Sequence, residues 1–308
     1  MPARVTQGMM SRQLIRDLNA NMLRNSVYQN QLSTGRKINK PSDDPVGITF
    51  SMRYRSELAA TDQYQRNVDA AVSSLEYIDK MLGQAGNVLQ RVRELVVQGA
   101  TGTNPPTAMD AIRTEIKQLY DQLVNIGNSQ FNGKYVFNGQ MTGTPPYSTV
   151  SLDDTDPSKP KAYDSDPDTG QIKYPVAPGV QIPVNVSGRD VFGSASDPDN
   201  AFRILSDIYT ALEQYDHEAV GDTLGRLDSR IDQLLRMHTE VGARSNRVEL
   251  IQERLNDMSI NLQNLQSKTE DADIAEVITN LKMGENVYQA SLSVGARLIT
   301  PSLVDFLR

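Results

Sequence analysis

The chain has 308 residues, a formal net charge of −7 and neither cysteine nor tryptophan. The acidic balance argues against a general nucleic-acid binder, because phosphate contacts need clustered Lys and Arg. No apolar run approaches the ~18 residues of a membrane-spanning helix, and the lack of cysteine excludes disulfides and thiolate chemistry.

The first predicted element is a helix over residues 7–34 with a narrow apolar stripe, formed by Leu14, Ile15, Leu18, Met22 and Leu32. Residues 1–40 carry seven Lys or Arg against a single acid, Asp17. This start lacks the continuous apolar stretch of a secretory signal, although its composition is compatible with a mitochondrial transit peptide.

The next segment, residues 32–47, has the residues of a turn between two helices. Gly35 is expected to cap the first helix, with Arg36 near the negative end of its dipole. Asp43 and Asp44 directly precede Pro45, which is typical of an N-cap followed by proline in the first turn. A catalytic pair of carboxylates is the less favoured alternative.

Two proline-free stretches, 46–104 and 199–300, carry heptad patterns. In the first, apolar residues alternate in steps of three and four from Val68 to Val96. After a Gly/Pro-rich break the spacing resumes over 109–126, where Thr107 and Asp110 suggest a capping box. The second stretch holds two seams joined by a slip of register near 242–244. Such seams predict long helices packed as a coiled-coil-like bundle.

Two interruptions between the heptad stretches have β character. In 129–139, Asn132 and Gly133 are flanked by aromatic and β-branched residues, which predicts a hairpin. The segment 141–198 holds nine of the 15 prolines, together with strand-like runs such as 180–186. We interpret it as a small β-rich insertion rather than as disorder, with its prolines at edges, bulges and loops.

The last predicted helix spans about 272–299, and the chain stays apolar to its end. The apolar residues are Ile278, Leu281, Tyr288, Leu292 and Ile299, followed by Leu303, Phe306 and Leu307. Residues 271–308 carry five acids against three bases, the opposite balance to the N-terminus. Because a lone amphipathic helix is marginal in water, we expect a partner, either the other terminus or other copies of the chain. Surface helices on a globular core are the alternative.

Residues suited to catalysis or metal binding are scarce. Only His217 and His238 are present, and His238 occupies a heptad position, which favours a partly buried seam residue over a catalytic base. The aspartates of 164–170 imitate a calcium loop, but its Gly comes one place late and Pro175 replaces the closing Glu. No P-loop, dinucleotide fingerprint or nucleophile elbow occurs. We therefore predict no enzyme, no cofactor and no metal site.

The segment LSTGRKINKPSDDPVG closely resembles the N-terminal signature of the bacterial flagellin superfamily. The residues that carry this motif are Gly35, Arg36, Ile38, Asn39, Pro41, Asp43, Asp44 and Pro45. With proline at positions 41 and 45, the segment resembles the hook–filament junction proteins of the superfamily more than the flagellins, which tend to carry small residues at these two positions. RVTQGMM near the start, the FNGKYVFNG hairpin and the ending SLVDFLR add to this likeness. The resemblance covers about 1–140 and 199–308, and Pro2-Ala3 ahead of Arg4 departs from the usual start.

This resemblance implies an extracellular structural protein without enzymatic activity or cofactor. It would be exported unfolded through the growing flagellum, without a cleavable signal, while a dedicated chaperone holds its C-terminal segment. It would form a ring with copies of itself, between hook-associated protein 1 and flagellin, without nucleic acid or membrane insertion. A short flagellin that forms the filament itself is the alternative. An intracellular coiled-coil adaptor would leave both terminal motifs unexplained.

We therefore predict a mainly α fold: a long coiled-coil-like helical bundle formed by both chain ends, with a β-hairpin and a small β-rich inserted domain. Residues 1–42 plus 271–308 would form a discontinuous terminal assembly domain. Residues 43–140 plus 199–270 would form the helical bundle domain, with the hairpin near 129–139. Residues 141–198 would form the outer insertion.

Overall fold

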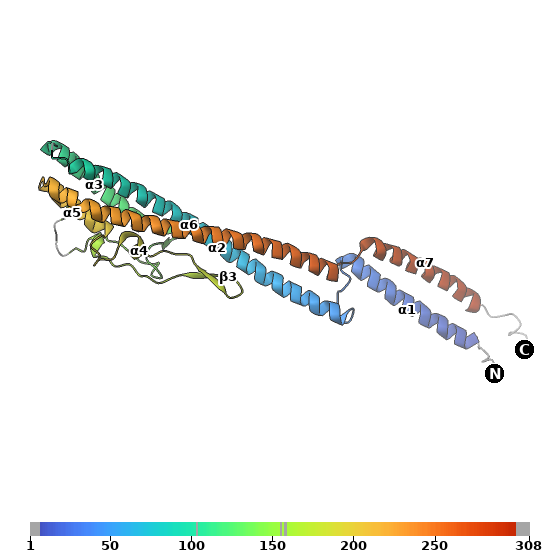
Figure 1. Ribbon diagram of the computed structural model, residues 1–308. Helices are drawn as coiled ribbons and strands as arrows, with labels where there is room; N and C mark the ends of the chain where they lie inside the picture. The colour runs from blue at the N-terminus through green and yellow to red at the C-terminus, as the bar shows by residue number, and fades with distance from the viewer. Residues whose placement is uncertain (1–6, 103, 155, 157–158, 300–308) are drawn as a thin grey trace, which may run out of the picture. The chain divides into compact units, whose positions relative to one another are not determined.

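The computed structural model describes residues 7–299 except 103, 155, 157 and 158 (Figure 1). The described chain is mainly α, as predicted, and it forms two compact units. Residues 1–60 and 258–308 belong to the first, here called the terminal unit, and residues 61–257 form the central unit. The predicted apolar residues Leu303, Phe306 and Leu307 lie outside the described residues.

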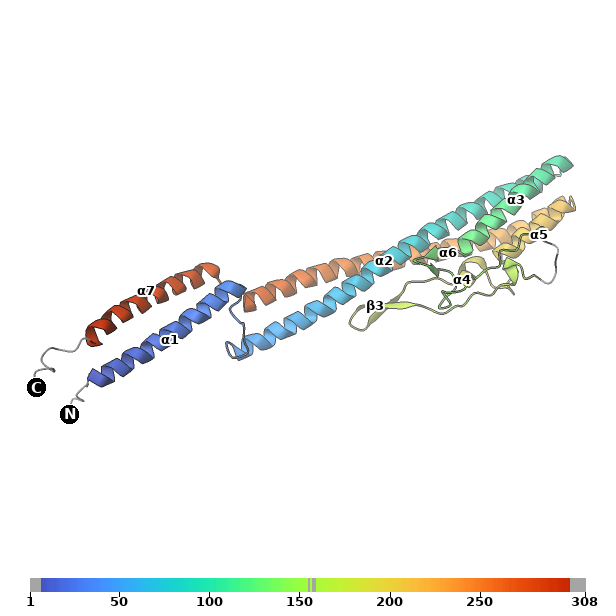
Figure 2. The same ribbon diagram turned by 180° about the vertical axis from the view of Figure 1, so that it is seen from behind.

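The terminal unit contains two helices from opposite ends of the chain. Helix α1 spans Gln7–Thr34 and helix α7 spans Ile274–Ile299, within two residues of the predicted bounds. Figures 1 and 2 show the two helices side by side and antiparallel. The unit also includes the first turns of α2 (Pro45–Gly99) and the last turns of α6 (His217–Glu270).

The central unit is built on the predicted heptad seams. Every seam residue of α2 from Val68 to Val96 is buried, and α6 contributes Leu227, Leu234, Val241, Val248 and Leu255 to the same core. Heptad positions recur on one face of a helix, so they meet a neighbouring helix along its whole length. Helices α3 (Pro106–Gly127) and α5 (Ala201–Glu213) complete the bundle.

The start of α3 differs from the sequence-based expectation. No side chain caps this helix, and the capping box expected from Thr107 and Asp110 does not form. Pro105 occupies the N-cap and Pro106 opens the helix. Proline suits this position because its missing N–H would have no partner inside the helix.

Two antiparallel hairpins lie in the central unit. Strands β1 (Gln130–Phe131) and β2 (Lys134–Tyr135) flank Asn132 and Gly133, whose φ angles of 51° and 75° form the predicted tight turn. Strands β3 (Lys173–Ala177) and β4 (Val180–Pro183) form the second hairpin. Asn67 Nδ2 of α2 donates to the Pro175 carbonyl at 2.8 Å, which ties β3 to the bundle.

The insertion 141–198 is packed onto the bundle by an aromatic cluster. Besides β3–β4, its described part contains a 3-10 turn (η1, Ala162–Asp164), α4 (Gly188–Phe192) and irregular loops. Tyr147 and Phe192 contact Phe202 of α5, with ring centroids 4.7 and 5.4 Å from that ring. These rings are almost fully buried, so the insertion contributes to the core of the central unit.

No helix within the described part of the chain is both long and apolar enough to cross a membrane.

Candidate assembly site

Helices α1 and α7 face each other along a seam of partly or fully buried residues. The seam residues are 14, 18, 21, 25 and 28 on α1 and 277, 281, 284, 288, 291 and 295 on α7. Both sets alternate in steps of three and four, as in a coiled coil. Leu14 packs against Gly295, and Asn21 Nδ2 donates to the Gly284 carbonyl at 3.0 Å.

The predicted interface residues divide between this seam and the surface. Leu14, Leu18, Leu281 and Tyr288 belong to the seam, whereas Met22, Leu32, Ile278 and Leu292 are exposed. The side chain of Ile299 lies outside the described residues.

Four exposed apolar residues of α1 and α7 share one side of the pair. Ile15, Met22, Ile278 and Leu292 each directly follow a seam position and are 44–53% exposed. In an antiparallel pair of right-handed helices, residues one position after the seam fall on the same side of both helices. We call these four residues the open face. Contiguous exposed apolar surface is characteristic of interaction sites, which makes the open face the candidate assembly surface.

The ends of this helix pair are defined by local signals. Gly35 adopts φ +70° and its N–H donates to the Gln31 carbonyl at 2.8 Å, which ends α1 as predicted. Asp273 Oδ1 accepts from the N–H groups of Ala275 and Glu276 at 2.9 and 3.1 Å and begins α7.

Two connectors, 35–44 between α1 and α2 and 271–273 between α6 and α7, are joined by backbone hydrogen bonds. The Lys37 N–H donates to the Glu270 carbonyl at 2.6 Å, and the Ala272 N–H donates to the Gly35 carbonyl at 3.0 Å. Arg36 and Asp271 form an isolated β-bridge. The connectors therefore hold the C-terminal end of α1 beside the N-terminal end of α7.

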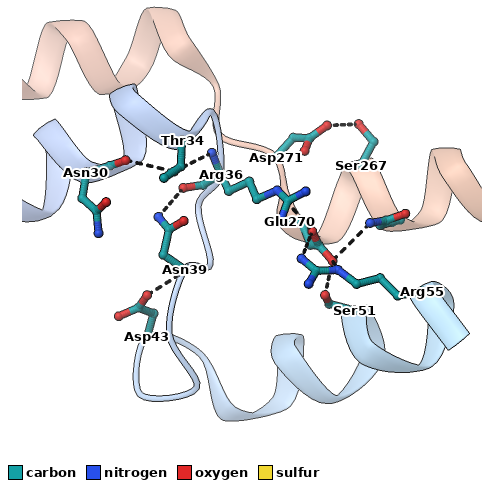
Figure 3. Close-up of polar contacts among 11 residues, drawn as sticks. Asn30, Thr34, Arg36, Asn39, Asp43, Ser51, Arg55, Ser267, Glu270 and Asp271 are labelled. Carbon is teal, nitrogen blue, oxygen red and sulfur yellow. Dashed lines mark hydrogen bonds and ion pairs between the residues drawn. The ribbon is translucent and has the colours of Figure 1, made fainter.

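The Glu270 carboxylate lies at the centre of this region (Figure 3). Arg55 of α2 donates to its two oxygens from Nε at 2.8 Å and from Nη2 at 2.6 Å, and Ser51 Oγ donates to Oε1. Arg36 Nε lies 3.6 Å from Oε2. Glu270 is only 1% exposed, so it is a buried charge neutralised by arginine.

The environment of Glu270 also determines its protonation. Burial by itself would raise the pKa of the carboxyl, but hydrogen bonds from Arg55 and Ser51 outweigh burial and hold this pKa below its ordinary value of 4.5. The group is therefore charged at neutral pH.

The two signature aspartates accept backbone hydrogen bonds at the start of α2 and within the connector 35–44. Asp44 Oδ1 accepts from Val46 N at 3.1 Å and Gly47 N at 2.9 Å, which makes it the predicted N-cap of α2. Asp43 Oδ2 accepts from the N–H groups of Asn39 and Lys40 at 3.0 and 2.7 Å.

The remaining motif residues lie in the same connector and at the start of α2. Asn39 Nδ2 donates to the Arg36 carbonyl at 3.0 Å. Ile38 is buried, and a Cβ added at Gly47 would lie 2.6 Å from Ile38 Cδ1, so the connector approaches α2 closely. Pro41 and Pro45 are exposed, and Pro45 occupies the first turn of α2.

The aspartates of the acidic loop 164–170 and the side chain of His238 have partners within the central unit. Asp164 accepts from Lys161 N at 3.0 Å, Asp166 from Ser194 Oγ at 3.2 Å and Asp168 from Gln140 N at 2.7 Å. In the described part of the chain, no three His, Asp or Glu side chains are grouped to hold a metal ion. His238 is partly buried, and its Nε2 lies 2.8 Å from Asp79 Oδ1.

Sequence reasoning missed three polar residues of this site. Asn21 and Asn25 are in heptad register with Leu14 and Leu18, and this spacing could have located them. Glu270 has no such signal, because its partners are distant in the sequence: Arg55 is 215 residues away.

The comparison with known proteins agrees with the resemblance seen in the sequence. Residues 5–142 match the bacterial flagellin N-terminal helical region, and residues 224–307 match the bacterial flagellin C-terminal helical region. A flagellin of Halalkalibacterium halodurans is 26% identical, over 92% of this chain and 90% of that protein. The flagellar hook-associated protein 3 of Escherichia coli is 24% identical, over 94% of both chains.

A similar fold occurs in a solved structure. It is a putative flagellar hook-associated protein from Vibrio parahaemolyticus, with a TM-score of 0.64 and 20% identity, covering 74% of this chain and 100% of that one. The two matched flagellin regions take in most of the present chain and contain both helices of the seam, the connector and Glu270. The chain therefore belongs to the bacterial flagellin family and is a structural protein of the bacterial flagellum.

Proposed function

We propose that this protein is the hook–filament junction subunit of its flagellum, the role of hook-associated protein 3. Copies of the chain would form a ring on hook-associated protein 1, and flagellin would polymerise on that ring. A flagellar export chaperone would hold the C-terminal segment before assembly. The protein would act outside the cell, at the hook–filament junction.

The open face is the observation that carries the assembly role. Ile15, Met22, Ile278 and Leu292 remain exposed after α1 and α7 have paired, and neighbouring copies would bury them. Burial of apolar surface contributes about 25 cal/mol per Å², so contacts repeated around a ring would stabilise the assembly. The terminal unit would form its inner layer, the helical bundle the next layer, and residues 141–198 the outer surface.

The signature motif favours the junction over the filament. Pro41 and Pro45 restrict the backbone of the connector, and both are junction-like in the signature motif. A junction subunit needs two different end contacts, whereas a filament subunit needs one head-to-tail contact that repeats without closing.

A seeding experiment tests this proposal. Purified protein is mixed with filament fragments, and the products are measured by electron microscopy, with flagellin as the positive control. We expect at most short caps from this chain. We also expect that cells lacking the protein release flagellin into the medium instead of growing filaments. Long filaments made of this chain alone would contradict the junction role.

A short flagellin is the second candidate, because the Halalkalibacterium halodurans flagellin is as similar in sequence and coverage as hook-associated protein 3. Long filaments in the seeding experiment would select this candidate. Both candidates use the same open face, so the assembly role does not depend on the choice between them.

A further inference from the structure

The seam between α1 and α7 contains polar and small residues at positions where a stable coiled coil carries leucine or isoleucine. Asn21 is 5% exposed, and its Nδ2 donates to the Gly284 carbonyl. The Oδ1 atom of Asn25 is buried and has no hydrogen-bond partner within the described part of the chain. A buried polar atom without a partner destabilises the structure that buries it. The seam is therefore less stable than a seam filled by leucines would be.

Two close contacts define how α1 and α7 are aligned. Leu14 lies against Gly295, where an added Cβ would be 2.7 Å from Leu14 Cδ2. Asn25 lies against Gly284, where an added Cβ would overlap Asn25 Oδ1. The two contacts are separated by the same length of chain on both helices, from 14 to 25 and from 284 to 295. In an antiparallel pair this means one register throughout.

Counting along both helices in this register places a larger residue opposite a smaller one at several levels of the seam. Leu18 is opposite Ser291, as Leu14 is opposite Gly295 and Asn25 is opposite Gly284. The small residues on α7 let the two backbones approach, because no Cβ or only a short side chain separates them.

A slip by one heptad in either direction would separate Asn25 from Gly284. Moving α1 by seven residues in one direction would place Leu14 opposite Tyr288 and Asn25 opposite Val277, so that two large residues meet and an amide faces an apolar side chain. In the other direction Leu32 would still meet a small residue, Gly284, but Asn25 would meet the side chain of Ser291 instead of a glycine. A seam of uniform leucines would tolerate either slip, whereas a buried asparagine specifies one register at some loss of stability.

We propose that Asn25 and Gly284, supported by the hydrogen bond from Asn21, set the register of α1 on α7. They thereby determine which residues of the two helices stand level with each other on the open face. The three are positioning residues, since they act through the alignment of the helices. The proposal applies to a junction ring and to a filament alike, so it does not depend on the choice between those functions.

Disulfide trapping in the full-length chain tests the register directly, because the sequence contains no cysteine. Leu18→Cys with Ser291→Cys reports the observed register, and Ser11→Cys with Ser291→Cys reports the one-heptad slip that places Leu14 opposite Tyr288. Both pairs are oxidised in the free protein and on flagella, and intramolecular cross-links are quantified by gel mobility and peptide mapping. We expect the observed-register pair to react at least tenfold more than the slipped pair.

Variants of the three residues then separate register from simple stability. Asn21→Leu with Asn25→Leu should raise the slipped cross-link at least tenfold relative to the observed one, although the seam becomes more apolar. Asn30→Leu, an exposed position on the same helix, is the matched control and should leave the ratio unchanged. Gly284→Asn should abolish the observed-register cross-link, and adding Asn25→Gly should restore it by exchanging the large and small partners.

An unchanged ratio in the double leucine variant would overturn the proposal, as would a failure of the exchange variant to restore the cross-link. Absence of both cross-links in the free and the assembled wild-type background would also overturn it, because α1 would then not pair with α7. A failed seeding experiment would leave these ratios unaffected, so the two proposals fail separately.

Discussion

At the scale of single residues, Glu270 joins separate segments of the terminal unit through its polar contacts. Its carboxylate accepts hydrogen bonds from Arg55 and Ser51, while its backbone carbonyl accepts one from Lys37. One residue thus contacts the connector that follows α1 and the first turns of α2. Its loss should affect both at once.

Replacing Glu270 with glutamine should weaken the contacts that join the two connectors, 35–44 and 271–273. The amide cannot satisfy the Arg55 guanidinium as a carboxylate does, and an imperfectly paired buried group costs about 1–3 kcal/mol. Native-state hydrogen exchange at the Lys37 and Ala272 amides should therefore accelerate. Glu253→Gln, at an exposed position earlier in α6, is the control. Equal protection in all three proteins would show that the carboxylate does not hold the connector.

The same contact should make the connector sensitive to acid. The pKa of Glu270 in the folded protein lies below its ordinary value of 4.5, so its charged form contributes stability above pH 4.5. That contribution is lost as pH falls through the lowered pKa. The protection factors of the Lys37 and Ala272 amides, which correct for the pH dependence of intrinsic exchange, should fall below pH 4.5 in the wild type and change less in the Glu270→Gln variant. A parallel pH profile in both proteins would assign the effect to other groups.

At the scale of elements, the long helices could be predicted because their apolar residues repeat without a miss. All nine predicted seam positions between Val68 and Val96 are buried. For α7 the apolar pattern pointed to Ile278 and Leu292, one position from the seam. The reason is physical: Gly284 and Ser291 occupy the seam, and a search for apolar residues finds the flank beside them.

The insertion and the connector depend on contacts that have no local period. Tyr147 gives no sign in the sequence that it packs against Phe202, and the irregular loops of 141–198 offer no alternation to read. The capping residues Gly35 and Asp44 were predictable because their roles depend on the backbone next to them. Glu270 was not, since its environment arises only when the two ends of the chain meet.

A proline in α7 tests the role of this helix in assembly. Leu281→Pro should cost about 3 kcal/mol locally, because proline removes a hydrogen bond and clashes with the preceding turn. Cells that carry only this variant should lose motility, while the thermal unfolding of the central unit stays unchanged. Asn286→Ala, at an exposed position of the same helix, is the control. Normal motility with Leu281→Pro would mean that an intact α7 is dispensable.

At the scale of the whole molecule, apolar burial is divided unequally between the two units. The central unit holds the heptad seams and the aromatic cluster, whereas the terminal unit keeps an apolar face exposed. Stability should therefore reside mainly in the central unit, and assembly should depend mainly on the terminal unit.

A fragment of residues 43–270 should separate the two properties. Its melting temperature by circular dichroism should stay within about 4 °C of that of the full chain, which corresponds to roughly 1 kcal/mol for a domain of this size. It should not complement motility in cells that lack the full protein. A fragment that fails to melt cooperatively would show that α1 and α7 are needed to fold the bundle.

The contacts of the terminal unit also have a consequence for the order of folding. Arg55 and Glu270 are 215 residues apart in the chain, and Asn21 and Gly284 are 263 residues apart. A chain that emerges from the ribosome with its N-terminus first cannot form either contact until nearly all of it has been synthesised. Contacts of such high sequence separation form late, after the large loop-closure entropy has been overcome. Throughout translation, α1 thus remains without the helix against which it packs in the finished protein.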